Sequence, residues 1–136
     1  MRFRVLVVED EESILLSLEF LLEKEGYEVR TASDGVAALT ELEQLLPDLV
    51  LLDVMLPLID GFELCRLIRE NPMLCNTRIM LVTARGREAE IARGMALGAD
   101  AYLTKPFSTR DLMARVRTLL ATPVSPKPSS EGYESR

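Results

Sequence analysis

Acidic, hydroxyl and basic side chains directly follow four short segments that this 136-residue sequence predicts to be strands. The residues, with the segments that precede them, are Glu9 and Asp10 after 3–8, Asp53 after 49–52, Thr83 after 79–82, and Lys105 after 100–104. The segment 49–52 is apolar throughout, which is typical of a strand buried on both faces of a parallel sheet. Because the carboxyl ends of parallel strands share one edge of an open sheet, we expect the five side chains to converge there.

Three converging carboxylates repel one another and raise the pKa of at least one of them, unless a cation neutralises them. Mg²⁺ suits such a set because it binds a few carboxylates and keeps several waters and phosphate oxygens as ligands. A lysine ammonium can hold a phosphoryl oxygen, and a threonine hydroxyl is a neutral donor to the same oxygen. The set therefore indicates phosphoryl transfer, with a carboxylate as the nucleophile and an acyl phosphate as the product.

The composition argues against several other chemistries. The chain has no histidine and only two cysteines, which disfavours a zinc site and a Ser–His pair, and it contains no Walker-type loop. Its net charge of −6, without a basic patch interleaved with aromatic residues, argues against direct nucleic-acid binding. No apolar stretch approaches the roughly 20 residues that span a bilayer, so we expect a cytoplasmic protein without membrane contact.

Helical patterns separate the predicted strands. A further strand is expected at 27–31, and apolar residues at helical spacing predict five helices, within 14–25, 33–46, 60–70, 87–97 and 108–121. Five strands alternating with five helices predict an α/β fold, in which a doubly wound five-stranded parallel sheet carries helices on both faces. The segment 87–97 has few apolar positions, so we expect its helix to be the most weakly anchored.

Length and composition allow a single domain. With 136 residues, of which 48% are hydrophobic and 28% charged, the chain can bury one well-packed core. We assign residues 1–121 to this domain. Residues 122–136 are rich in proline and serine, and we expect a flexible tail or an interdomain linker there. Such a segment is either the start of a linker to a further domain or the natural end of a single-domain protein, and we favour the first, in which the chain is a piece of a longer protein.

The residues that follow the strands resemble those of a known family, the receiver domain of bacterial two-component response regulators. The matching motifs are Glu9-Asp10, Asp53 with the following Val-Met-Leu-Pro and Asp60-Gly61, Thr83-Ala84, and Lys105-Pro106-Phe107. The resemblance extends over residues 3–121. It implies the flavodoxin-like strand order 2-1-3-4-5, and a cis peptide bond at Lys105-Pro106, a geometry that is inexpensive only before proline.

The resemblance also implies a role for each residue of the set. Asp53 would be the phosphorylated aspartate. The implied ligands of Mg²⁺, or alternatively Mn²⁺, are Glu9, Asp10, Asp53 and the backbone carbonyl of Met55. The implied contacts to the phosphoryl group are Thr83, Ala84 and Lys105, and Tyr102 would be an aromatic switch residue coupled to Thr83.

The implied function is that of a signalling domain and not of an enzyme with a separate substrate. A histidine kinase or phosphotransfer protein would donate the phosphoryl group to Asp53, and the domain would support Mg²⁺-dependent transfer and its own dephosphorylation. The surface formed by 87–97, 100–104 and 108–121 would then change and control an output domain or effector protein. The same surface is a candidate homodimer contact.

Three positions depart from the family pattern. Leu58 stands where many relatives carry glycine, so we expect a stiffer or more apolar loop after Pro57. Ile91 and Ala101 stand where DNA-binding relatives carry charge on their dimer surface, although Asp111 and Arg115 are present. A dimer held by those charged pairs is therefore disfavoured, and an apolar or heterotypic contact remains open.

Two other functions fit the sequence less well. One is a pseudo-receiver that acts only as an interaction scaffold, which would not need the acid pair, the hydroxyl and the lysine together. The other is a phosphatase or mutase with an aspartyl-phosphate intermediate. In such enzymes an acid usually follows the nucleophile by two residues, whereas this chain has Met55 there.

Overall fold

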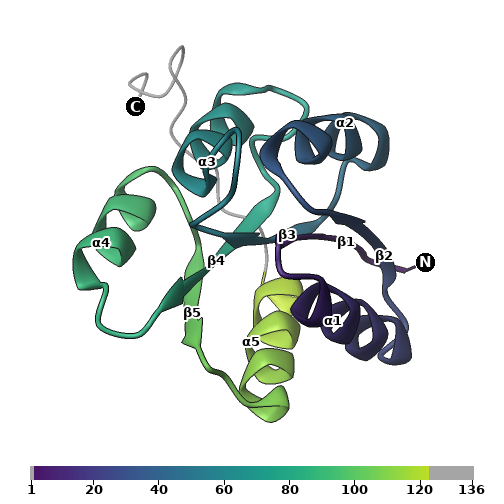
Figure 1. Cartoon of the computed structure of the whole chain (residues 1–136). Coiled ribbons are helices and arrows are strands. Elements are labelled where there is room, and N and C mark those ends of the chain that lie inside the picture. Colours follow the sequence, from purple (N-terminus) through teal and green to yellow (C-terminus); the bar gives the residue numbers. More distant parts are fainter. Residues whose placement is uncertain (1, 123–136) are drawn as a thin grey trace.

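A computed structural model describes residues 2–122 of the chain, and within this range five parallel strands form one sheet in the order β2-β1-β3-β4-β5 (Figure 1). The strands are β1 (Arg4–Val8), β2 (Glu28–Ala32), β3 (Leu49–Asp53), β4 (Arg78–Ala84) and β5 (Ala101–Lys105). The helices are α1 (Glu12–Lys24), α2 (Gly35–Leu45), α3 (Gly61–Glu70), α4 (Glu88–Ala96) and α5 (Thr109–Ala121). The predicted fold class and strand order are confirmed.

Helices cover both faces of the sheet. Figure 1 shows α1 and α5 on one face and α2, α3 and α4 on the other. Consecutive residues of the central strand β3 point to opposite faces. Leu51 therefore belongs to the core under α1 and α5, while Leu52 belongs to the core under α2 and α3, and both side chains are fully buried. Burial on both faces explains why this strand is a continuous apolar run.

Side-chain caps begin three of the helices where the sequence predicts their starts. The carboxylate of Asp34 accepts a hydrogen bond from the backbone N–H of Ala37, and that of Asp60 accepts one from Glu63. The hydroxyl of Ser108 likewise accepts one from Asp111. These bonds satisfy backbone donors that the first helical turn leaves unpaired.

The helix α4 differs from its neighbours in how it is held. It begins without a side-chain cap hydrogen bond, and Gly94 is its buried residue. A Cβ at Gly94 would overlap with Cδ1 of Leu81, so the helix backbone packs directly against this side chain of β4. Few apolar side chains anchor α4, in agreement with the expectation from its sequence.

Four strands run further toward the carboxyl edge than the sequence predicts, β4 by two residues and β2, β3 and β5 by one residue each. Thr83 and Ala84 lie inside β4, in register with Thr104 and Lys105 of β5. The peptide bond that follows, Lys105-Pro106, is cis, as the resemblance implies. Across the described residues 2–122, no helix is long and apolar enough to cross a membrane. The predicted tail lies outside these residues, apart from Thr122.

Candidate phosphoacceptor site

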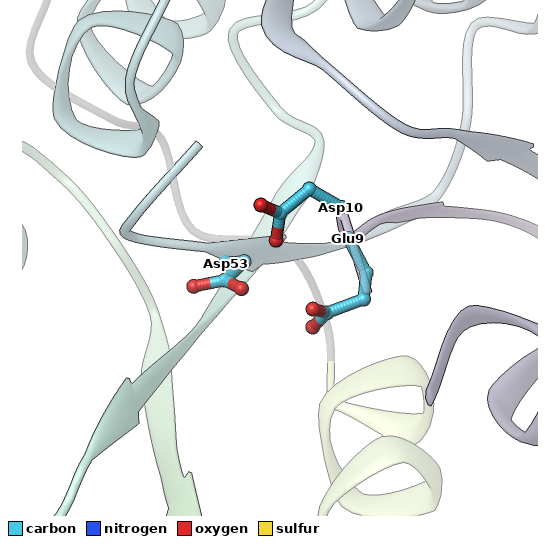
Figure 2. Close-up of side chains that lie close together, drawn as sticks. All are labelled: Glu9, Asp10 and Asp53. Carbon is cyan, nitrogen blue, oxygen red and sulfur yellow. The ribbon is translucent and has the colours of Figure 1, made fainter. Parts of the chain in front are cut away.

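The carboxyl edge of the sheet brings together acidic residues from two adjacent strands. Glu9 and Asp10 follow β1, and Asp53 is the last residue of β3, which pairs with β1. Oxygen atoms of the three carboxylates lie within 4.8 Å of one another, and Figure 2 shows the side chains gathered at the edge of the sheet. Glu9 and Asp53 are buried, with 2% and 6% of their surfaces exposed, whereas Asp10 is exposed.

Lys105 connects two of these carboxylates. Its Nζ lies 3.1 Å from Oδ2 of Asp53 and 3.1 Å from Oε1 of Glu9. Burial disfavours the ammonium, but the hydrogen bonds and charges of Glu9 and Asp53 outweigh this effect and raise the pKa of Lys105. The lysine is therefore a permanent cation that offsets part of the negative charge at this edge.

Burial dominates the electrostatics of Glu9. Desolvation and the neighbouring charge of Asp53 raise the pKa of this carboxyl above its ordinary value of 4.5. Lys105 and the backbone N–H of Glu11, which donates to Oε2 of Glu9, act in the opposite direction and only partly compensate. Proton uptake by Glu9 is thus easier than by an exposed glutamate.

The backbone after β3 also faces the acidic cluster. The N–H of Met55 donates a hydrogen bond of 3.0 Å to Oδ1 of Asp53, while the Met55 side chain is 65% exposed. Leu58, further along this loop, has φ = 73° and is 76% exposed. That backbone region favours glycine, so a leucine there holds about 1–3 kcal/mol of strain. A glycine at this position would adopt the same backbone without that strain.

Thr83 lies at the same edge, but its hydroxyl is engaged elsewhere. The side chain is 3% exposed, and Oγ1 donates a hydrogen bond of 3.0 Å to Oε1 of Glu90 in α4. Glu90 is paired in turn with Arg87. Glu90 is not recognisable from the sequence as a residue of this site, because an acidic residue in the first turn of a helix is ordinary.

The two remaining candidates occupy the side of the site formed by β4 and β5. Ala84 is exposed and lies opposite Lys105 in the strand register. Tyr102 is 37% exposed, and the guanidinium of Arg115 lies 5.8 Å from the centre of its ring. The tyrosine thus faces outward against α5, while Thr83 is turned toward α4.

An open doubly wound sheet with buried acids, a lysine and a hydroxyl at its carboxyl edge defines the class of α/β folds whose ligand sites lie at that edge. A family model, the response regulator receiver domain, matches residues 5–117. The chain belongs to this family.

Relatives of known name agree with this assignment. The chain is 47% identical over 131 residues to the alkaline phosphatase synthesis transcriptional regulatory protein PhoP of Bacillus subtilis (strain 168), covering 96% of this chain and 54% of PhoP. It is 50% identical over 117 residues to the phosphate regulon transcriptional regulatory protein PhoB of Rhizobium meliloti (strain 1021), covering 86% of this chain and 52% of PhoB. The chain thus spans about half the length of these relatives.

Solved structures agree as well. The chemotaxis protein CheY4 of Vibrio cholerae superposes with a TM-score of 0.83 at 31% identity, covering 88% of this chain and 99% of CheY4. The fold and family predicted from the motifs are therefore confirmed, whereas the roles of the individual residues stay predictions.

Proposed function

We propose that this domain accepts a phosphoryl group on Asp53 from a phosphohistidine of a partner kinase or phosphotransfer protein, in the cytoplasm, and passes the signal to an output domain or effector. The observation that carries the proposal is the position of Asp53. One oxygen of its buried carboxylate accepts a hydrogen bond from the Lys105 ammonium, and the other accepts one from the backbone N–H of Met55. This arrangement supports a reactive role over the scaffold alternative.

The acidic cluster fits a divalent cation. Its three carboxylates offer oxygens within 4.8 Å of one another, and oxygen is the ligand that Mg²⁺ and Mn²⁺ prefer. Glu9, Asp10, Asp53 and the carbonyl of Met55 would hold the ion. When bound, the ion supplies positive charge that offsets the phosphoryl oxygens and the carboxylates.

The residues of the chain itself would carry the transfer. A carboxylate oxygen of Asp53 attacks phosphorus, the bond from phosphorus to the imidazole nitrogen breaks, and its electron pair returns to the imidazole. The Lys105 ammonium neutralises charge on the transferred group, and Thr83 and the backbone of Ala84 donate hydrogen bonds to its oxygens. Hydrolysis of the acyl phosphate would return Asp53 to its carboxylate form.

The proposed output is a change in the surface formed by α4, β5 and α5. Thr83 would turn inward to the phosphoryl group, and Tyr102 would turn toward the space that Thr83 leaves. The inward and outward positions of Thr83 and Tyr102 are both populated before phosphorylation, and the phosphoryl group shifts the equilibrium between them. This surface exposes Met95 and Tyr102, so we further propose that it forms a homodimer through apolar contacts.

Replacing Asp53 by Ala tests the phosphoacceptor assignment. Incubation with radiolabelled acetyl phosphate and Mg²⁺ should label the wild type at one site and leave the Asp53→Ala variant without label, because the attacking oxygen is missing. The Asp111→Ala variant, altered at an exposed aspartate of α5, should label as the wild type does. Undiminished labelling of Asp53→Ala would refute the assignment.

A further inference from the structure

The two ends of α4 are attached to the rest of the domain by different polar contacts. At the carboxyl end, the guanidinium of Arg69 in α3 donates hydrogen bonds to the carbonyl of Gly98 at 2.9 Å and to that of Thr77 at 2.6 Å. It also forms an ion pair of 2.9 Å with Asp100, whose carboxylate accepts from the N–H of Ile79. The side chains of Arg69 and Asp100 are 6% and 13% exposed. This end is therefore held by a buried network to α3 and β4.

The amino end of α4 has fewer contacts to the rest of the domain. Its N-cap residue, Arg87, makes no side-chain cap hydrogen bond, and the helix has no buried apolar side chain in its first turn. A groove of about 490 Å³ lies between this end and the loop after β3, with Val54, Met55, Leu56, Asp60, Arg87 and Glu90 among its lining residues. The hydrogen bond from Thr83 to Glu90 joins this end of the helix to the sheet.

Thr83 has a single hydroxyl proton to donate. In this structure the proton goes to Glu90, at 3.0 Å. Arg87 and Thr83 both lower the pKa of the Glu90 carboxyl against the opposing effect of burial, so the acceptor is a carboxylate near neutral pH. A hydroxyl that donates to Glu90 cannot at the same time donate to a phosphoryl oxygen on Asp53. The two acceptors therefore compete.

We propose that Glu90 is a positioning residue, which holds the Thr83 hydroxyl on α4 in the unphosphorylated state and releases the amino end of that helix when a phosphoryl group takes the hydroxyl. The proposal deepens the proposed function and rests on it. The buried network around Arg69 keeps the carboxyl end in place, so the helix pivots about Gly98 and does not move as a whole. Because the bond to Glu90 exists only in the unphosphorylated arrangement, it opposes activation.

Removing the acceptor tests this role. Beryllofluoride with Mg²⁺ serves as the probe for the phosphorylated state, and its affinity is measured by titration calorimetry. The Glu90→Ala variant should bind about three- to tenfold more tightly than the wild type, which corresponds to the net contribution of one hydrogen bond. The Glu90→Gln variant keeps an acceptor oxygen and should fall between the two.

Glu88 provides the matched control. It lies in the same first turn of α4, carries the same charge and is exposed, so Glu88→Ala should bind beryllofluoride as the wild type does. A folded Glu90→Ala variant that binds no more tightly than the wild type would overturn the proposal. An equal gain in Glu88→Ala would also overturn it, since the effect would then be one of charge alone.

A second measurement does not depend on phosphorylation. Without Mg²⁺ or beryllofluoride, amide hydrogen exchange in Glu90→Ala should speed up at Ile91, whose N–H donates to the carbonyl of Arg87, and should stay unchanged at Leu97 and Gly98. Thr83→Val should do the same, and the double variant should add nothing further. Additive effects of the two substitutions would show that Thr83 and Glu90 do not act through a shared hydrogen bond, and would refute the proposal. Failure of the wild type to bind beryllofluoride, with this exchange pattern intact, would instead count against the proposed function.

Discussion

One cation, Lys105, contacts two buried carboxylates, those of Glu9 and Asp53, but its single positive charge cannot neutralise both. Nζ of Lys105 lies 3.1 Å from an oxygen of each carboxylate, and Asp10 adds a third acid at the exposed side. The group therefore keeps an excess of negative charge. In the absence of a metal ion, that excess opposes folding, because the charges repel and two of the acids have lost part of their hydration.

The raised pKa of Glu9 predicts a pH dependence of stability with a definite sign. Between the ordinary value of 4.5 and the higher value in the fold, the folded chain binds more protons at Glu9 than the unfolded chain. The contribution of Glu9 to the free energy of unfolding therefore falls as the pH rises through this window. The Glu9→Gln variant should lack this fall and be more stable than the wild type at pH 7 in EDTA.

Urea unfolding at a series of pH values measures the effect. Glu12→Gln, at an exposed acid that begins α1, serves as the control and should keep the wild-type dependence. Mg²⁺ should reverse the order at pH 7, because a bound ion stabilises the wild type by RT ln(1 + [Mg²⁺]/Kd) and the variant lacks one ligand. A Glu9→Gln variant that is less stable than the wild type in EDTA would contradict the account.

At the scale of the elements, α3 carries two arginines in contrasting surroundings. The side chain of Arg69 is 6% exposed and binds three carbonyls and Asp100, whereas Arg66 is 43% exposed and pairs with Glu63 and Glu70 on the surface of its own helix. Buried ion pairs are costly to break because the partner keeps its charge in a poorly hydrated position. Exposed ion pairs contribute little to the free energy of unfolding, because water and salt screen their charges.

Arg69→Ala should therefore lower the free energy of unfolding by about 3 kcal/mol, while Arg66→Ala should change it by less than about 1 kcal/mol. Urea unfolding followed by circular dichroism measures both variants under the same conditions. Equal losses in the two variants would show that the network around Arg69 does not anchor the end of α4.

At the scale of the whole molecule, the sheet separates two cores, and α4, β5 and α5 form a surface that exposes apolar side chains. Ile91 and Ala101 are half-buried there, and Met95 is 40% exposed. Asp111 and Arg115 already pair with each other within the chain, at 3.3 Å. The exposed apolar side chains of Met95 and Tyr102 are candidate contacts on this surface.

If this face forms a homodimer, beryllofluoride and Mg²⁺ should promote association of the wild type, and Ile91→Glu should weaken it by about tenfold or more, because an unpaired charge would be buried in the contact. Sedimentation velocity measures the association. Leu16→Glu serves as the control, since Leu16 is 54% exposed on α1, across the sheet from α4. A monomeric wild type at all concentrations, or equal weakening by both variants, would exclude this dimer.

The sequence alone determined the elements of the fold and the residues at its functional edge. Strand and helix periodicities are local properties, and the run 49–52 identified the central strand because a strand covered on both faces must be apolar throughout. Residues that follow parallel strands meet at one edge whatever the helices do, so the convergence of Glu9, Asp53 and Lys105 followed from the topology.

Only the tertiary structure decided which residues Thr83 and Arg69 contact. The bond from Thr83 to Glu90 depends on how α4 lies over β4, and that in turn depends on the close approach at Gly94. The network of Arg69 with Asp100 joins residues 31 positions apart. Neither contact can be recognised from the sequence pattern. A polar residue at a given position of a helix gives the same pattern whether its side chain is exposed to water or bound to a buried partner.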